Sequence, residues 1–114
     1  MNTTVRECDG YVLAEVTGTI DESDKAAFDE HLHSVIESPG KRLLVDLSGS
    51  PRITSAGIGH LVTLVSRANA KGNRVVLANL SPFVESIFQA TKLTKFFDIA
   101  ATVDEGIVRL RNPQ

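Results

Sequence analysis

Hydrophobic and polar positions divide the chain into segments with the period of a strand and segments with the period of a helix. Residues 3–17 show the strand pattern, interrupted by Asp9-Gly10. That dipeptide between two such runs predicts a hairpin with a type I′ turn, which needs positive φ at both central positions. Residues 11–16 form the better strand of the two. The chain is therefore expected to begin with a β-hairpin.

A first helix is expected after Gly18. Residues 21–24 read Asp-Glu-Ser-Asp, and they place hydrogen-bond acceptors and carboxylates where a helix N-terminus favours them. Hydrophobic residues then recur at helical spacing until Pro39-Gly40 ends the pattern. The side chains predicted to face inward are Phe28, Leu32, Val35 and Ile36.

The centre of the sheet is expected at residues 43–47, an apolar run that is broken only by Asp46. Such a run is typical of a strand that is covered on both faces. A second helix follows, because apolar residues recur at helical spacing and Lys71-Gly72-Asn73 supplies a C-terminal signal. Its predicted inner stripe consists of Ile58, Leu61, Val62, Val65 and Ala68.

A further strand and helix are predicted after this. Residues 74–78 form a short apolar strand, and Ser81-Pro82 reads as an N-cap followed by proline at the first helical position. This third helix is expected to run to about Lys92. Its inward side chains are Val84, Ile87, Phe88 and Leu93.

The chain is expected to end with a weak strand at residues 96–100 and a short helix through Leu110. Residues 102–105, Thr-Val-Asp-Glu, fit a capping box at the start of this helix. A hairpin followed by alternating helices and strands predicts an α/β fold with right-handed crossovers. We therefore expect a mixed sheet of about five strands packed with about four helices.

Composition and charge exclude several classes of function for this chain. The 114 residues are 42% hydrophobic and 23% charged, as in an ordinary soluble domain with one core. Twelve basic residues against fourteen acidic ones give a net charge of -2, which argues against a nucleic-acid binder. No apolar run approaches the roughly 20 residues that span a bilayer, and no secretory signal pattern opens the chain. No membrane insertion and a cytoplasmic location are therefore expected.

Complete enzyme motifs are not found in the loop before the second helix, residues 46–59. This loop is rich in Gly, Ser and Thr, and free amides at a helix N-terminus favour anions. A dinucleotide fingerprint would require Gly where Val62 stands, and a nucleophile elbow would require Gly where Ile53 stands. No P-loop is present either. We therefore expect no enzyme activity and no cofactor.

Histidine and cysteine do not suggest a catalytic or metal site. His31 and His33 are two residues apart on a predicted helix, so they point to different faces, and Cys8 is the only cysteine. His60 lies near Ser55 in sequence, but no third partner for a Ser-His pair is apparent. Solvated surface histidines and no metal site are predicted.

Several segments together carry a family resemblance that covers nearly the whole chain. The chain resembles the STAS domain of bacterial anti-sigma factor antagonists, which implies a single STAS domain over residues 1–114 with helices mainly to one side of a mixed sheet. The segments are Gly-Thr-Ile-Asp at 18–21, Leu-Val-Asp-Leu-Ser-Gly at 44–49, Ile-Thr-Ser-Ala-Gly-Ile-Gly at 53–59, Asn-Arg-Val-Val-Leu at 73–77, Ser-Pro-Phe-Val at 81–84 and Leu-Thr-Lys-Phe-Phe at 93–97.

The resemblance implies a phosphorylation switch. In this family, the residue that matches Ser55 is phosphorylated by the partner anti-sigma factor, a serine kinase that uses ATP and magnesium. The unphosphorylated protein would bind that kinase and release a sigma factor, and a serine phosphatase would reverse the modification. The partner-binding residues implied by the family arrangement are Asp21, Thr54, Ser55, Ala56, Gly57 and Ile58.

The sequence departs from the family motif at two positions. Thr54 stands where the family commonly has Asp, and Ala56 stands where it has a second serine. Thr54 is therefore a second, less favoured acceptor. The departure also supports an alternative, a constitutive STAS scaffold of a signalling or lipid-transport complex. A small enzyme or nucleotide-binding protein that uses the Ser55 loop is a third hypothesis.

Structural roles remain open for each of these residues. Ser55 could serve only as an N-cap, or Thr54 could be the cap with Ser55 in the first turn. Gly57 and Gly59 could serve helix packing or the close approach of a partner. Asp21 is favoured as an N-cap, and Asp46 is favoured as a structural residue that bonds a neighbouring loop. The sequence leaves the oligomeric state open.

Overall fold

Within residues 1–112, five strands form one mixed sheet, and their order in the sheet follows their order in the chain. The computed structural model describes residues 1–112. β1 pairs antiparallel with β2, and every later pair is parallel, so the prediction of a mixed five-stranded sheet is confirmed. The strands are β1 (Asn2–Cys8), β2 (Tyr11–Thr17), β3 (Arg42–Gly49), β4 (Arg74–Ala78) and β5 (Asp98–Ala100).

The hairpin between β1 and β2 is confirmed, but its turn type is not. Cys8 pairs with Tyr11, which leaves Asp9 and Gly10 as the two turn residues. Gly10 has φ +84°, whereas in residues 1–112 only Asn79 and Lys92 have positive φ among non-glycine residues. The prediction of a type I′ turn is therefore wrong. Glycine takes the left-handed conformation without a Cβ penalty, and Asp9 keeps a negative φ.

In the described part of the chain, four helical regions pack on the sheet, as predicted. The first helical segment combines η1 (Glu22–Asp24), α1 (Lys25–Ala27) and the π-helical η2 (Phe28–His33). The later ones are α2 (Ser55–Ala70), α3 (Pro82–Ala90) with the short η3 (Leu93–Lys95), and α4 (Val103–Arg111). α3 ends before the expected Lys92, because that residue takes the left-handed conformation with φ +61°.

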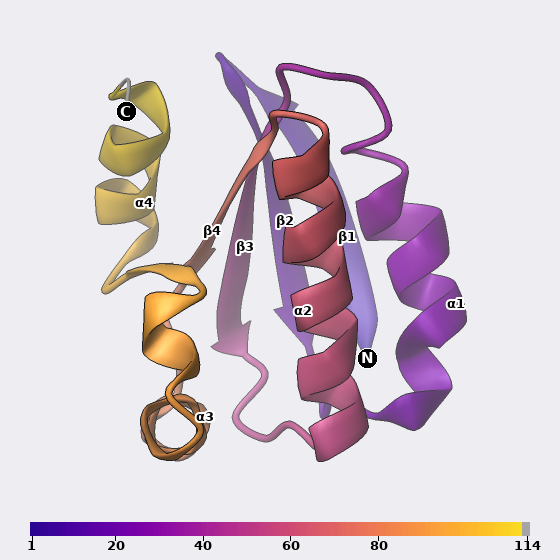
Figure 1. Cartoon of the computed structure of the whole chain (residues 1–114), viewed down its shortest axis with the longest axis vertical. Helices are drawn as coiled ribbons and strands as arrows, with labels where there is room; N and C mark the ends of the chain where they lie inside the picture. The colour runs from indigo at the N-terminus through magenta and orange to yellow at the C-terminus, as the bar shows by residue number, and fades with distance from the viewer. Residues whose placement is uncertain (113–114) are drawn as a thin grey trace.

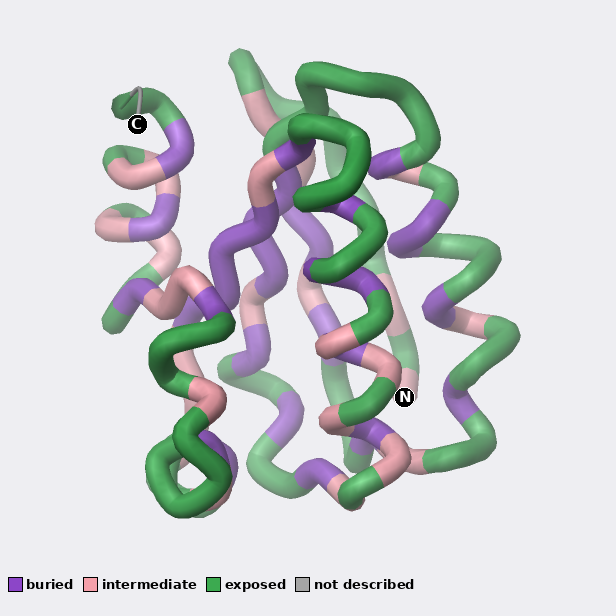
Figure 2. Tube along the Cα trace, viewed as in Figure 1, coloured by how far each residue is buried: buried purple, intermediate pink, exposed green. Residues whose placement is uncertain are grey.

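The helices lie on both faces of the sheet, with most of them on one face (Figure 1). The first helical segment, α2 and α3 contribute to a large apolar cluster with Leu43, Val45 and Leu47 of β3. α4 packs on the opposite face, where Leu110 meets Leu44 and Val76. Figure 2 shows β3 and β4 as the most buried strands, while β1 is largely exposed. The prediction of a central strand covered on both faces is thus confirmed for β3.

α4 is held at its start by a cap that differs from the predicted box. Thr102 accepts a hydrogen bond from the backbone of Glu105 at 3.1 Å, as expected. The Glu105 carboxylate accepts from Ala101 N at 3.2 Å, instead of from the N-cap residue. Asp98 of β5 then joins Arg74 and Arg109 at 2.8 and 2.9 Å. This ion-pair network connects β4 and β5 to α4.

Asn73, just before β4, has a structural role that its sequence position did not indicate. The residue is 5% exposed, and its Nδ2 donates to the carbonyls of Ile36 and Ser38 at 2.8 and 3.0 Å. Its Oδ1 accepts from Lys41 N at 2.6 Å. Asn73 therefore satisfies three backbone groups of the connection between the first helical segment and β3.

Asn73→Ala should lower the free energy of unfolding by about 3 kcal/mol, because buried backbone groups would lose their partners. The measurement is urea unfolding followed by circular dichroism. The control is Asn69→Ala, an exposed position near the end of α2. Equal stabilities of the two variants would contradict the role of Asn73.

Candidate functional site

The loop before α2 is bonded to the segment that follows β2. Ile20 and Ile53 form a parallel bridge. Ile20 O accepts from Thr54 N at 3.0 Å, and Ile20 N donates to Arg52 O at 3.3 Å. Buried Ser50 donates from its hydroxyl to Val16 O at 3.1 Å. Two of the sequence segments that carry the family resemblance therefore lie side by side at one edge of the sheet.

Thr54 is the N-cap of α2. Its Oγ1 accepts from Gly57 N at 3.2 Å and lies 3.4 Å from Ile20 O, to which it donates. Ser55 is the first residue of the helix, is exposed, and takes no part in the cap. Of the two capping alternatives, the one with Thr54 as the cap is confirmed, and the one with Ser55 as the cap is wrong.

The start of α2 favours a negative charge next to Ser55. The amide of Gly57 is occupied by Thr54 Oγ1, and Ile58 N donates to Thr54 O at 2.9 Å. The amides of Ser55 and Ala56 are the first two of the helix, so they have no acceptor within it. These amides and the helix dipole stabilise an anion at this position.

The two glycines of this turn have different surroundings. A Cβ added to Gly57 would lie 2.2 Å from Ile20 O and 2.8 Å from Ile53 Cγ1. A Cβ added to Gly59 would meet nothing within 4 Å. Gly57 is buried and Gly59 is exposed. Gly57 therefore allows the helix to approach the Ile20 carbonyl, which is the packing role considered from the sequence.

Gly57→Ala should destabilise the protein by about 3 kcal/mol, because the new methyl group would overlap a backbone carbonyl. Gly59→Ala is a matched control on the same helix, and it should stabilise the protein by about 0.5–1 kcal/mol through helix propensity. Thermal and urea unfolding of the two variants would measure both effects. A Gly57→Ala variant as stable as the parent would disprove the close contact.

Asp21 caps η1, as the sequence favoured. It accepts from the amide and hydroxyl of Ser23 at 2.9 and 2.6 Å, and its own amide donates to Asp24 Oδ2 at 2.8 Å. The Ser23 hydrogen bonds lower the pKa of the Asp21 carboxyl below its usual value. Asp21 O also lies 3.1 Å from His60 Nε2. Asp21 is therefore placed beside the first turns of α2.

The histidines differ from the prediction of three solvated side chains. His31 is exposed, but His33 is buried and His60 is half-buried. The His60 ring lies 5.2 Å from the ring of Phe28, and its Nε2 engages Asp21 O. His60 is therefore held by Asp21 and Phe28. His33 is the last residue of the π-helical segment η2, and it is buried there together with Phe28 and Leu32.

Asp46 has the structural role that was favoured for it. Its Oδ1 accepts from Ser48 N at 2.9 Å and from Asn79 Nδ2 at 3.1 Å. Asn79 has φ +59° directly after β4. Asp46 therefore joins the ends of β3 and β4.

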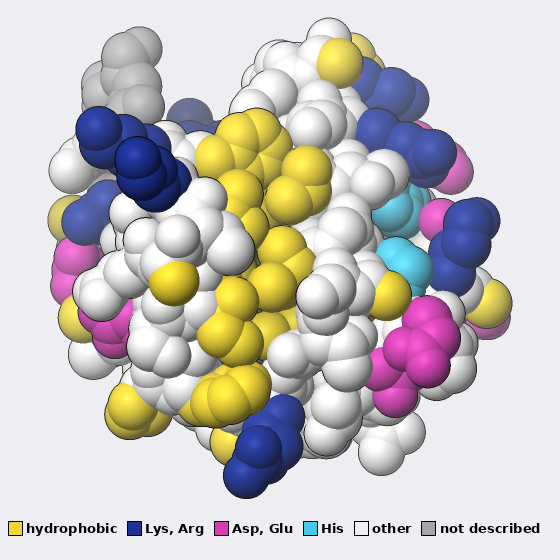
Figure 3. Space-filling view, turned by 60° about the horizontal axis from the view of Figure 1, so that its bottom comes forward, with side chains coloured by type: hydrophobic (Ala, Val, Ile, Leu, Met, Phe, Trp, Pro, Cys, Tyr) yellow, Lys and Arg dark blue, Asp and Glu magenta, His cyan; other side chains and the backbone are white. Residues whose placement is uncertain are grey.

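An exposed aromatic side chain beside the loop that leads to α2 was missed from the sequence. Phe83 at the start of α3 is 44% exposed, and the Arg52 guanidinium lies 5.4 Å from the centre of its ring. Ser81 Oγ donates to Pro51 O at 2.8 Å, so the start of α3 is fixed to the loop before α2. Figure 3 shows a band of hydrophobic side chains on this face. The sequence did contain a signal for this exposed side chain, because Phe83 lies outside the inward-facing positions predicted for the third helix.

Within residues 1–112 no group of three or more His, Cys, Asp or Glu side chains could hold a metal ion. Over the same residues, no helix has the length and hydrophobicity needed to cross a membrane.

Comparison with known proteins identifies a family model. The model of the STAS domain matches residues 2–106. The protein BtrV of Bordetella bronchiseptica, provisionally described as an anti-sigma factor antagonist, is 22% identical over 100 residues, which cover 88% of this chain and 86% of BtrV.

Solved structures share the fold. The crystal structure of an anti-sigma factor antagonist from Mycobacterium paratuberculosis is 26% identical with a TM-score of 0.82, over 97% of this chain and 94% of that one. The Bacillus cell fate determinant SpoIIAA in its phosphorylated form is 20% identical with a TM-score of 0.73, over 96% and 100% of the two chains. These similarities agree with the mixed sheet and the placement of its helices.

Proposed function

Because the chain belongs to the STAS domain family, we propose that it is an anti-sigma factor antagonist whose binding is switched by phosphate on Ser55. The observation that carries this proposal is the separation of two roles at the start of α2. Thr54 caps the helix, and the adjacent Ser55 hydroxyl is exposed. Modification of Ser55 therefore leaves the cap intact.

Phosphate on Ser55 suits the fold of the free protein. It adds about 1.5 to 2 negative charges at neutral pH and three acceptor oxygens. The free amides of Ser55 and Ala56 and the helix dipole stabilise such a charge by about 0.3–1 kcal/mol at an exposed helix end. The phosphorylated protein therefore keeps its structure.

The same phosphate opposes a docked partner. The proposed partner surface contains Asp21, Thr54, Ser55, Ala56 and Ile58, with Gly57 packed beneath it. A phosphate buried there without a cationic partner costs several kcal/mol of desolvation. Every 1.4 kcal/mol is about tenfold in affinity, so one modification is enough to dissociate the complex.

Ser55 is a better acceptor than Thr54. Thr54 is half-buried, and its hydroxyl accepts from Gly57 N and donates to Ile20 O, so phosphorylation would remove the proton that it donates to Ile20 O. The exposed Ser55 hydroxyl carries no such cost.

The proposed partners are an anti-sigma factor that is a serine kinase and a serine phosphatase that reverses its action. ATP and magnesium belong to the kinase, and this chain acts as a binding module instead of an enzyme. In this proposal residues 1–114 form a single STAS domain that works in the cytoplasm.

Ser55→Asp should weaken binding to the anti-sigma factor by at least about tenfold while its melting temperature stays near that of the parent protein. Ser55→Ala should bind like the unmodified protein and should not dissociate when ATP is added. The measurement is a pull-down from native lysate followed by titration calorimetry with the captured kinase. Ser66→Asp is the control, because it adds the same charge to an exposed serine further along α2. Equal binding by both Asp variants would refute the switch.

Thr54→Asp tests whether the departure from the family motif slows phosphorylation. Asp caps a helix as well as Thr does, and Ile20 O keeps its hydrogen bond from the amide of residue 54, so the fold should persist while the acidic residue of the family motif is restored. We expect the kinase to phosphorylate Ser55 faster in this variant than in the parent protein. Mass spectrometry over time measures the two rates. Thr54→Ser is the control, because it keeps a hydroxyl cap without the charge. Modification of residue 54 in this control, with Ser55 unmodified, would reassign the acceptor.

A constitutive scaffold is the second candidate function, and the observation that favours it is Thr54 in place of the family's acidic residue. In that function Ser55 is only the first residue of α2. A partner complex that survives both ATP treatment and Ser55→Asp would support the scaffold over the switch.

A further inference from the structure

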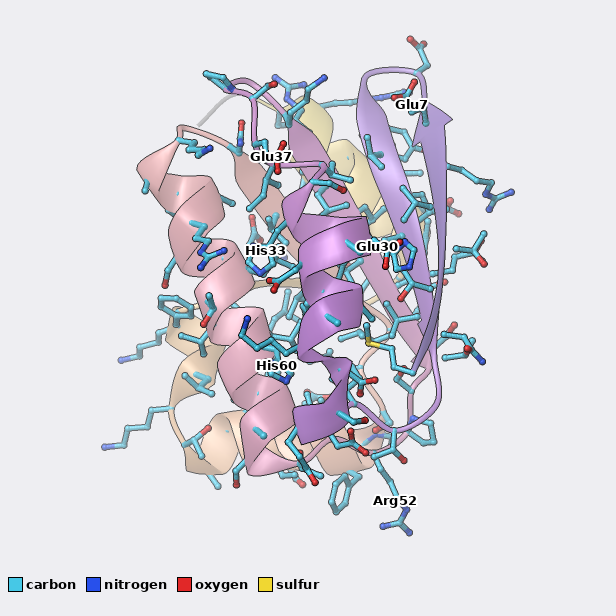
Figure 4. All side chains as sticks on the ribbon, turned by 90° about the vertical axis from the view of Figure 1, so that its right-hand side faces the viewer. Glu7, Glu30, His33, Glu37, Arg52 and His60 are labelled. Atoms are coloured by element: carbon cyan, nitrogen blue, oxygen red, sulfur yellow. The ribbon has the colours of Figure 1, made fainter. Side chains whose placement is uncertain are left out.

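A groove lies between the first helical segment and the C-terminal half of α2. Its volume is about 450 Å³, and its walls are formed by His33, Ile36, Glu37, Arg67 and Lys71. Figure 4 shows His33 between the two helices. Arg67 follows Ser55 by twelve residues, which is about 18 Å along a helix, so the groove is separate from the proposed switch.

The His33 ring in this groove is buried and incompletely hydrogen-bonded. The residue is 9% exposed, and its buried Nδ1 has no hydrogen-bond partner in residues 1–112. A proton on Nδ1 would therefore be an unsatisfied buried donor. Burial and Arg67 lower the pKa of His33, and Asp29 offsets this only in part. The lowered pKa favours the neutral ring, and a proton on Nε2 avoids the unsatisfied donor at Nδ1.

Among residues 1–112, the Nε2–H of His33 has no acceptor within hydrogen-bond distance. The nearest carboxylate oxygen, Asp29 Oδ1, is 3.9 Å away, beyond hydrogen-bond distance. The other oxygen of Asp29 accepts from Lys25 Nζ at 3.0 Å. The Nε2–H is therefore available to an acceptor that enters the groove.

Positive charge exceeds negative charge at the groove walls. Neither Arg67 nor Lys71 forms a salt bridge within the described residues, and Lys71 Nζ donates to the backbone carbonyl of Glu37 at 2.8 Å. Glu37 is the one acidic residue among the five that form the walls. The charged and titratable groups that affect the pKa of His33 are Lys25 and Asp29 of the first helical segment and His60 and Arg67 of α2.

We propose that this groove binds a small organic acid. Arg67 and Lys71 would hold its carboxylate, the Nε2–H of His33 would donate to one carboxylate oxygen, and the apolar body would lie against Ile36. A guanidinium matches a carboxylate with two parallel hydrogen bonds. The volume falls in the usual range for small-molecule sites.

Nuclear magnetic resonance on the full chain tests this site. Sodium butanoate is titrated while the side-chain signals of His33 and Arg67 are followed, with butan-1-ol and sodium chloride as probes that lack the carboxylate. We expect saturable shifts of both side chains with butanoate alone. Shifts that do not saturate, or that chloride reproduces, would overturn the proposal. Tighter binding of inorganic phosphate than of butanoate would overturn the assignment to an organic acid.

Arg67→Gln should weaken butanoate binding by about tenfold, since it removes the fork that binds the carboxylate. Arg42→Gln is the matched control, because it removes the same charge from an exposed position on β3. Amide spectra of both variants verify that each is folded. Equal butanoate affinity in the two variants would contradict the site. Binding of the kinase to the Arg67→Gln variant should be unchanged, so failure here is distinguishable from failure of the Ser55 switch.

Discussion

The backbone carbonyl of Ile20 is the contact on which the site depends. It accepts from the amide of Thr54 at 3.0 Å and from the Thr54 hydroxyl at 3.4 Å. It also occupies the space into which a Cβ at position 57 would project. One carbonyl between β2 and the first helical segment thus fixes where α2 begins. The absence of a side chain at Gly57 makes this approach possible.

The exposure of Ser55 follows from this contact. The Ile20 carbonyl orients the Thr54 hydroxyl toward Gly57 N, so Thr54 caps the helix and the Ser55 hydroxyl is not needed for the cap. A serine that capped the helix itself would have its hydroxyl engaged in the capping hydrogen bond. Modification of that hydroxyl would then disturb the cap. The division of roles between two adjacent hydroxyl residues lets a rigid helix end present a modifiable group.

Local signals predicted the elements well, and contacts between distant segments account for the errors. Ser81 and Pro82 open α3 as expected, because an N-cap and a proline act within one turn. The choice between Thr54 and Ser55 as the cap depends on Ile20, 34 residues earlier than Thr54. The side chain of Asn73 reaches Ile36, 37 residues away, although its position suggested only the end of a helix. His33 is buried at the end of a π-helical segment, which apolar spacing does not indicate.

Charge alone is sufficient for the proposed regulation, given this rigid frame. The chain has a net charge of -2, so one phosphate nearly doubles it and places the addition at a single helix end. In the free protein, water and the helix amides solvate the phosphate. In a complex, the partner removes that water while the helix contributes only about 1 kcal/mol in return. Desolvation of the phosphate costs several kcal/mol, which is more than the helix returns. The phosphate therefore weakens the association and leaves the stability of the fold nearly unchanged. A conformational change in the antagonist is therefore not required for release.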